Sequence, residues 1–203
     1  MTRAFNNLND IQEFVNQRLD DLGQGVKAVG WGDKASQYLR FDYLAKDFDF
    51  NEKSVMDIGC GLGDFIYYLI NKEIMNFSYF GIDLSDRMIE QCNMLFDAPN
   101  IHFHQGTIFN QGLKKVDVCI LSGALSYKFV GALENAEKTM AAMFDLAREG
   151  IALNFLSTKV DFELEKNQHY NPEEVLGWAR KLSKDVTLYE DYPLYEFTVV
   201  IKK

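Results

Sequence analysis

Short apolar runs alternate with longer amphipathic stretches along most of the chain. Runs of this length are typical of buried strands, whereas apolar residues spaced by three or four are typical of helices with one buried face. The runs predict strands directly before Gly59 and over residues 77–82, 101–106, 116–121, 151–156, 185–190 and 195–201. Helices are predicted over residues 9–22, 34–45 and 133–148, and after Gly63, Ser85 and Asn171. Strands that alternate with helices indicate an α/β fold with a largely parallel sheet.

The two ends of the chain depart from this alternation. Only a short turn containing Pro193 separates the last two predicted strands, so they pair antiparallel or lie at different places in the sheet. Two helices precede the first strand, and Gly23 is a natural end for the first of them. We expect residues 1–50 to form a helical cap over the strand ends and residues 51–203 to form the main domain. Gly150 is expected to end the helix over 133–148.

A glycine-rich turn joins the first strand to the next helix. Residues 55–65 read V-M-D-I-G-C-G-L-G-D-F, with glycine at positions 59, 61 and 63. Because glycine has no Cβ, Gly59 and Gly61 allow a sharp bend and a close approach of the backbone to a ligand. The start of the following helix offers free N–H groups to that ligand.

The turn resembles motif I of the class I S-adenosylmethionine (SAM) methyltransferases, D/E-x-G-x-G-x-G, with Asp57 as the acid. A nicotinamide-binding G-x-G-x-x-G turn would need glycine at position 64, where this chain has Asp64. The resemblance implies a Rossmann-like three-layer sandwich whose seven-stranded mixed sheet has an antiparallel last strand. It also implies SAM as the cofactor, S-adenosylhomocysteine as the product, and Asp57, Gly59, Cys60 and Gly61 in the binding site.

A second acidic residue ends the next strand. Asp83 follows the run 77–82, and a carboxylate there can accept hydrogen bonds from both ribose hydroxyls of an adenosine. The stretch G-I-D-L-S-D-R-M resembles motif II of the same family. The resemblance places Leu84 against adenine, with Met88 lining that side.

The carboxyl ends of the third and fourth strands supply the remaining cofactor candidates. The family usually has an acid where this chain has Thr107, so a threonine hydroxyl or the backbone of Ile108 would contact the adenine amino group. Leu121, Ser122 and Gly123 end the fourth strand, at the edge of the sheet where ligands bind in open parallel sheets. The resemblance places them near the sulfonium and amine of SAM.

Few residues are candidates for a direct role in catalysis. Tyr127 is close enough to the fourth strand to face a substrate, and His169 is the best candidate base, with Asp161 and Tyr170 as alternatives. Arg40, in the same region as Trp31, Gln37 and Tyr38, could pair with the carboxylate of the cofactor's methionine part. His102 and His104 lack a third ligand, so no metal site is expected.

Composition narrows the class of partner. The 203 residues carry a net charge of −9 without a basic stripe, which disfavours nucleic acid. No apolar run approaches the roughly 20 residues of a membrane span, and no signal peptide is evident. The three cysteines are far apart, as in a reduced cytoplasmic protein. The segment after the fourth strand lacks the N/D-P-P-Y of many amino-methylases of nucleic acid bases and of glutamine.

The sequence therefore favours a cytoplasmic enzyme, a monomer or homodimer, that methylates an oxygen or nitrogen of a small molecule. Two alternatives remain open at this stage. A catalytically silent SAM-binding module, acting as a regulator or partner subunit, would keep the glycine turn and Asp83. A nicotinamide oxidoreductase is disfavoured by Asp64 and by the pair of C-terminal strands.

Overall fold

A single seven-stranded sheet forms the centre of the protein. The computed structural model describes residues 4–203. The strands are β1 (Lys53–Ile58), β2 (Phe77–Asp83), β3 (Ile101–Gln105), β4 (Val116–Leu121), β5 (Ala147–Leu156), β6 (Val186–Tyr189) and β7 (Glu196–Lys202). They lie in the order β3-β2-β1-β4-β5-β7-β6, and β7 runs antiparallel to both of its neighbours. The predicted mixed sheet with an antiparallel last strand is confirmed.

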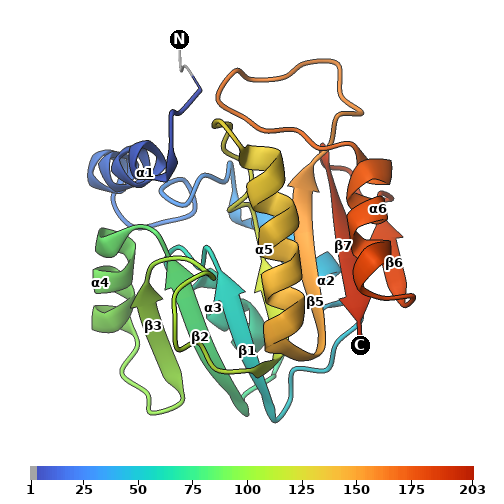
Figure 1. Ribbon diagram of the computed structural model, residues 1–203. Helices are drawn as coiled ribbons and strands as arrows, with labels where there is room; N and C mark the ends of the chain where they lie inside the picture. Colours follow the sequence, from blue (N-terminus) through green and yellow to red (C-terminus); the bar gives the residue numbers. More distant parts are fainter. Residues whose placement is uncertain (1–3) are drawn as a thin grey trace.

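Helices cover both faces of this sheet. They are α1 (Leu8–Leu22), α2 (Lys34–Ala45), α3 (Asp64–Asn71), α4 (Asp86–Leu95), α5 (Ala132–Leu146) and α6 (Pro172–Leu182). In Figure 1, α5 and α6 lie in front of the sheet, and α2 and α3 lie behind it. One apolar core separates α5 and α6 from the strands, and a second lies under α2 and α3. This is the predicted three-layer arrangement.

Local capping explains where the site-forming helices begin. The Ser85 hydroxyl accepts a hydrogen bond from the Met88 backbone N–H (3.0 Å) and so starts α4 immediately after Asp83. The Asn171 side chain accepts from the N–H groups of Glu173 and Glu174, with Pro172 in the first turn of α6. The Ser85 cap fixes the chain direction directly after the carboxyl end of β2, and the Asn171 cap does so after the loop that follows β5.

The junction between α5 and β5 corrects one expectation. The helix ends at Leu146 and β5 begins at Ala147, so Gly150 lies inside the strand rather than at the end of the helix. A Cβ at Gly150 would lie 2.4 Å from the carbonyl oxygen of Ile201 and 3.0 Å from the Phe48 ring. Glycine is needed here for the close packing of β5 against its neighbours.

The two N-terminal helices take different places. Helix α1 lies beside α4 at the end of the sheet where the parallel strands finish (Figure 1), and the Asn16 amide donates to the Asp86 carboxylate (2.8 Å). Helix α2 does not cover the strand ends: Phe41 and Leu44 belong to the core on the sheet face together with Phe65. The division into a cap of residues 1–50 and a domain of residues 51–203 stays a prediction. Of the two helices in the predicted cap, only α1 lies at the strand ends.

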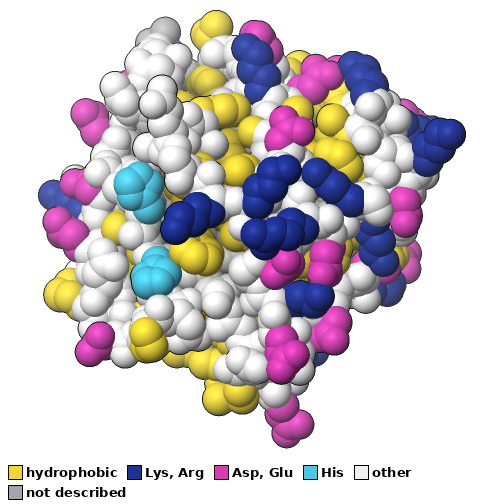
Figure 2. Space-filling view, turned by 60° about the horizontal axis from the view of Figure 1, so that its bottom comes forward, with side chains coloured by type: hydrophobic (Ala, Val, Ile, Leu, Met, Phe, Trp, Pro, Cys, Tyr) yellow, Lys and Arg dark blue, Asp and Glu magenta, His cyan; other side chains and the backbone are white. Residues whose placement is uncertain are grey.

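The opposite end of the molecule carries many charged side chains. Figure 2, turned toward the end where the parallel strands begin, shows Lys and Arg side chains beside acidic ones. Two ion pairs belong to the strands that begin there, Lys53 with Glu149 and Arg148 with Asp117. The acidic candidates for binding, Asp57 and Asp83, lie instead at the carboxyl ends of β1 and β2.

Candidate active site

The glycine turn after β1 has a conformation that only glycine accepts without strain. The backbone N–H groups of Gly59 and Cys60 both donate to the Ile82 carbonyl, at 2.7 and 3.1 Å. Gly59 has a φ of 74° and Gly61 a φ of 55°. A Cβ at Gly59 would lie 2.3 Å from the Ala124 Cβ, and one at Gly61 would lie 2.8 Å from the Val29 side chain. The absence of a Cβ at these two positions thus lets the side chains of Ala124 and Val29 lie close to the turn.

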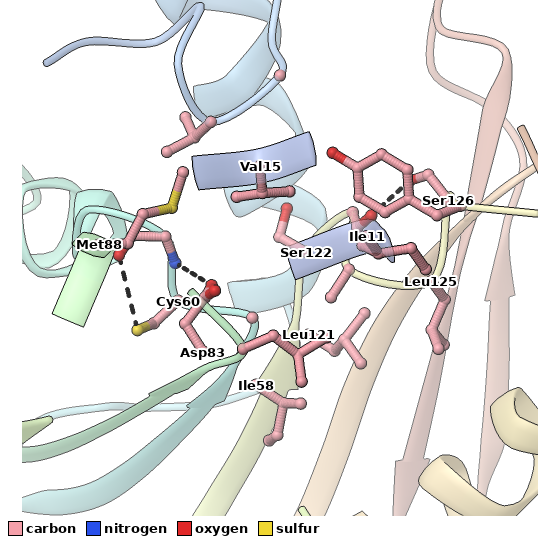
Figure 3. A pocket seen from close by; sticks show the side chains of 18 of the residues that line it. Ile11, Val15, Ile58, Cys60, Asp83, Met88, Leu121, Ser122, Leu125 and Ser126 are labelled. Atoms are coloured by element: carbon pink, nitrogen blue, oxygen red, sulfur yellow. Dashed lines mark hydrogen bonds between the residues drawn. The ribbon is translucent and has the colours of Figure 1, made fainter. Parts of the chain in front are cut away.

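Asp83 connects this turn to the start of α4. One carboxylate oxygen accepts from the Gly61 N–H (2.9 Å) and the other from the Ser85 N–H (2.9 Å), as Figure 3 shows for the first. Burial raises the pKa of Asp83 above its ordinary value, although these two hydrogen bonds oppose the shift. Each carboxylate oxygen keeps a further lone pair, with which it can accept a hydrogen bond from a hydroxyl group of a ligand in the cavity.

A cavity of about 430 Å³ lies against this turn. In Figure 3, Ile11 and Val15 of α1 lie above it, Cys60, Asp83 and Met88 on one side, and Leu125 and Ser126 on the other. All of the sequence-predicted cofactor residues line it: Arg40, Asp57, Gly59, Cys60, Gly61, Asp83, Leu84, Met88, Thr107, Ile108, Leu121, Ser122 and Gly123. Tyr127 lines it as well. The fold therefore gathers these residues around one space, and their contacts with a ligand stay a prediction.

Two buried polar atoms in the cavity wall fit a bound polar group. Within residues 4–203, the side-chain oxygens of Gln37 and Ser122 are buried and have no hydrogen-bond partner. The Gln37 amide nitrogen donates to the Asp64 carboxylate (3.0 Å), which fixes the direction of the free oxygen. Unsatisfied buried oxygens are costly, so a ligand with N–H donors near the glycine turn would be stabilised. The amino group of SAM is such a donor.

Asp57 is the most strongly perturbed acid of the site. The Tyr79 hydroxyl donates to its carboxylate (2.6 Å), and the side chain is buried at the end of β1. Burial raises the pKa of Asp57 to about 7, with a smaller contribution from the negative charges of Asp83 and Asp64. Near neutral pH this carboxyl group therefore exists in both protonation states.

We expect the stability of the protein to fall as the pH rises toward 7, in part because of Asp57. The folded protein keeps a proton on Asp57 up to about pH 7, whereas the unfolded chain releases it near its ordinary value of about 4. Between these values the folded state binds more protons, so its free energy of unfolding decreases with pH. Urea unfolding at a series of pH values should show a weaker decrease for Asp57→Asn than for the natural chain. Identical slopes in the two proteins would show that Asp57 titrates normally.

Arg40 requires a correction. Its Nε and Nη2 donate to the Glu196 carboxylate at 2.6–2.9 Å, and its Nη1 donates to the Ser36 carbonyl (2.7 Å). The guanidinium also lies 4.1 Å from the centre of the Trp31 ring. Because Arg40 and Glu196 are both buried, separating the two charges would be costly. Arg40 therefore lines the cavity while paired with Glu196, and its guanidinium is not free to bind the carboxylate of a cofactor.

His169 also departs from its expected role. It does not line the cavity, and its Nδ1 lies 2.7 Å from the Ser157 carbonyl oxygen. The chain around it bridges back to the end of β5, where Ser157 pairs with Tyr170. The two alternative candidates for the base, Asp161 and Tyr170, do not line the cavity either. The Tyr170 hydroxyl donates to the Leu125 carbonyl (2.9 Å). The sequence correctly predicted that these residues follow the carboxyl end of β5, but the path of the loop keeps them out of the cavity lining.

Thr107 is partly engaged within its own loop. Its hydroxyl lies 3.3 Å from the Asn110 side-chain oxygen and accepts from the Phe109 N–H (3.2 Å). The Thr107 side chain therefore stabilises the turn after β3 while also lining the cavity. A contact from this hydroxyl to an adenine stays a prediction.

Three residues that form or support the cavity wall were not predicted from the sequence. Glu196 holds Arg40, and the Asn154 amide donates to Glu196 (2.7 Å) while its oxygen accepts from the Gly123 N–H (2.8 Å). Arg18 of α1 donates to the Tyr127 hydroxyl (2.9 Å). An acid and an amide inside the apolar runs of β7 and β5 are a signal that could have indicated Glu196 and Asn154, because such groups are rarely buried without a partner.

The comparisons with known proteins agree with this fold. The turn, the acid after β2 and the inserted antiparallel strand define a class I SAM-dependent methyltransferase. Residues 49–196 match the family described as a methyltransferase domain, so the chain belongs to that family, whose members transfer a methyl group from SAM. The chain is similar to Rv1506c, a candidate methyltransferase of Mycobacterium tuberculosis, with 26% identity over 158 residues that cover 74% of this chain and 93% of the relative.

Solved structures of low identity share the fold. The magnesium protoporphyrin IX methyltransferase ChlM from Synechocystis PCC 6803, with SAM bound, superposes with a TM-score of 0.72 at 16% identity over the full length of both chains. A candidate SAM-dependent methyltransferase from Listeria monocytogenes has a TM-score of 0.61 at 18% identity, and the match covers 84% of this chain and 99% of that one.

The described residues form neither a metal-binding cluster nor a membrane-spanning helix. Among the residues from 4 to 203, no group of three or more His, Cys, Asp or Glu side chains is placed to hold a metal ion. No helix in the same part of the chain is long and apolar enough to cross a membrane.

Proposed function

We propose that this methyltransferase acts on an oxygen or nitrogen of a small organic molecule. The observation that carries the proposal is the enclosure of the cavity. Three segments far apart in the sequence join beside it: Phe5 bridges to Phe129, and Tyr127 bridges to Asn167. The Lys128 N–H donates to the Lys166 carbonyl (2.8 Å), which strengthens the second contact. A small molecule fits beneath such a cover, whereas a nucleic acid duplex or a folded protein does not.

Each group of lining residues has a proposed role toward the cofactor. Asp83 accepts the ribose hydroxyls, and Leu84, Met88 and Ile108 surround adenine together with Leu121 and the backbone next to Thr107. The turn of Gly59, Cys60 and Gly61, with Asp57, Gln37, Ser122 and Gly123, holds the amino-acid end. The acidic side chains of Asp57 and Asp64 suit a ligand that carries positive charge.

The contribution of the protein to the reaction is proposed to be positioning. SAM, when bound, supplies a methyl group on a positively charged sulfur, which is an activated leaving group. The side chains around the cavity hold the acceptor in line with that methyl group and exclude water, and orientation of this kind lowers the barrier substantially. Tyr127, held by Arg18, faces the acceptor side of the cavity and is proposed to orient it.

An assay with methyl-labelled SAM tests the proposal. The protein is incubated with a cell extract that has been separated into small molecules, nucleic acid and protein. We expect labelled product in the small-molecule fraction, with an equal amount of S-adenosylhomocysteine. Label that enters the nucleic acid or protein fraction instead would contradict the proposed acceptor class. Heat-denatured protein is the control for uncatalysed transfer.

The proposal also includes the oligomeric state and the compartment of the protein. The protein is proposed to work in the cytoplasm as a monomer or homodimer. The compartment is supported by three buried free cysteines, because free thiols persist in a reducing compartment.

A further inference from the structure

The acidic and the basic side chains that line the cavity come from different elements of the fold, and this bears on the acceptor. Asp57, Asp64 and Asp83 come from the ends of β1 and β2 and the start of α3. The cations Arg18 and Lys166 come from α1 and from the covering segment after β5. Glu196 and Arg40 neutralise each other. The inference rests on the proposed function, in which the acidic end holds the cofactor, so the cationic end is left for the acceptor.

These two cations lack counter-ions. Among residues 4–203, neither Arg18 nor Lys166 forms an ion pair with a carboxylate. Both are partly buried. The charge of Arg18 acts on Asp83, but two backbone N–H groups already bind that carboxylate. A cation that is partly removed from water without a partner is unfavourable, and an anionic ligand would relieve this cost.

Both cations pack against the same aromatic ring. The guanidinium carbon of Arg18 lies 5.6 Å from the centre of the Phe14 ring, and the Nζ of Lys166 lies 5.4 Å from the same ring. Arg18 is oriented further by hydrogen bonds to the Ala28 carbonyl (2.6 Å) and the Tyr127 hydroxyl (2.9 Å). The site is therefore built before any ligand binds, which lowers the entropic cost of binding an anion.

The cavity also lacks a suitable base at its acceptor end. None of the three histidines, all of which lie in the described part of the chain, lines the cavity. Burial raises the pKa of Tyr127 above its ordinary value, so this residue stays protonated at neutral pH. An acceptor oxygen that is already ionised needs no general base.

We propose that the acceptor is a small organic acid, whose carboxylate is held by Arg18 and Lys166 and is the group that becomes methylated. A carboxylate oxygen forms a bond to the methyl carbon while the bond from that carbon to sulfur breaks, and the electron pair of the broken bond remains on sulfur. No proton is released. The apolar body of the acid lies against the remaining wall, which includes Leu8, Ile11, Leu125, Leu156 and Leu164.

The product of this reaction differs from the substrate in the feature that the site recognises. A methyl ester carries no charge, so it loses the attraction of both cations. The site thus favours the substrate over the product and promotes release after transfer.

Binding of matched probes to the protein saturated with S-adenosylhomocysteine tests this proposal. Benzoate and benzamide have nearly the same shape, and only benzoate is charged at neutral pH. We expect benzoate to bind about tenfold more tightly, the scale of one charge-assisted hydrogen bond. Lys166→Met should remove most of this preference, and Lys166→Arg should keep it. Lys128→Met is the matched control, since Lys128 is exposed in the same cover, does not line the cavity, and should leave the preference unchanged.

Three results would overturn the proposal. They are equal affinity for the two probes, failure of both probes to bind, and a benzoate preference that survives both Lys166→Met and Arg18→Gln. Titration with S-adenosylhomocysteine alone separates this test from that of the cofactor site: normal binding of that compound together with a failed probe result rejects only the acid acceptor. With a methylated product in hand, release of methanol by mild alkali identifies an ester, and resistance to alkali would contradict one.

Discussion

Replacing Glu196 with alanine is expected to lower the free energy of unfolding by about 3–5 kcal/mol, the cost of leaving a buried charge without its partner. The side chains of Arg40 and Glu196 are 10% and 4% exposed, and their contact distance is 2.6 Å. The Asn154 amide loses its acceptor in the same variant. Urea unfolding of the two proteins measures the difference.

An exposed ion pair provides the control for this expectation. Lys159 and Glu190 lie 2.8 Å apart with side chains that are 61% and 34% exposed. Glu190→Ala should change the free energy of unfolding by about 1 kcal/mol or less. If Glu196→Ala cost no more than Glu190→Ala, the buried pair would not be a determinant of stability. Combining Arg40→Met with Glu196→Leu should recover part of the loss, because both charges are then absent.

Replacing Asp83 with alanine is expected to weaken binding of S-adenosylhomocysteine by about 1.5–3 kcal/mol, the scale of hydrogen bonds to a charged acceptor. The physical reason is that the carboxylate lines the cavity directly beside the glycine turn and retains lone pairs for the ribose hydroxyls. Isothermal calorimetry gives the dissociation constants. Asp97→Ala, at an exposed acid outside the cavity, should bind as the natural chain does.

A ligand without ribose hydroxyls separates direct contact from loosening of the turn. Asp83 also holds Gly61 and Ser85, so its removal changes the backbone as well as the contact. The natural protein should bind the dideoxyribose analogue more weakly than S-adenosylhomocysteine, and Asp83→Ala should bind both equally. A preference for the hydroxyl-bearing ligand that persists in Asp83→Ala would place the ribose elsewhere.

The part of the cavity wall at the carboxyl ends of the strands could be predicted from the sequence. The positions of Asp57, Asp83, Thr107 and Ser122 depend only on where a strand stops and on parallel strands sharing an edge. Hydrophobic periodicity is strong in such segments, so the sheet and its helices were also found. The error at Gly150 arose because the sequence does not show how closely two backbones approach.

The surroundings of His169 and Arg40 could not be predicted because they depend on contacts between distant segments. His169 lies in a loop whose path is decided by the pairing of Ser157 with Tyr170, and no local pattern specifies that pairing. Arg40 looked available because its partner, Glu196, is 156 positions away. Charge composition alone does not reveal which cations are matched, and Arg18 and Lys166 became candidates only once the ion pairs were known.

The place of Glu196 in the last strand has a consequence for biosynthesis. β7 is translated after every other strand of the sheet, yet it lies between β5 and β6 and supplies the partner of Arg40. A nascent chain therefore carries the glycine turn and Asp83 for most of its synthesis without a completed sheet. The sheet is therefore completed only when this strand has left the ribosome and entered the gap between β5 and β6.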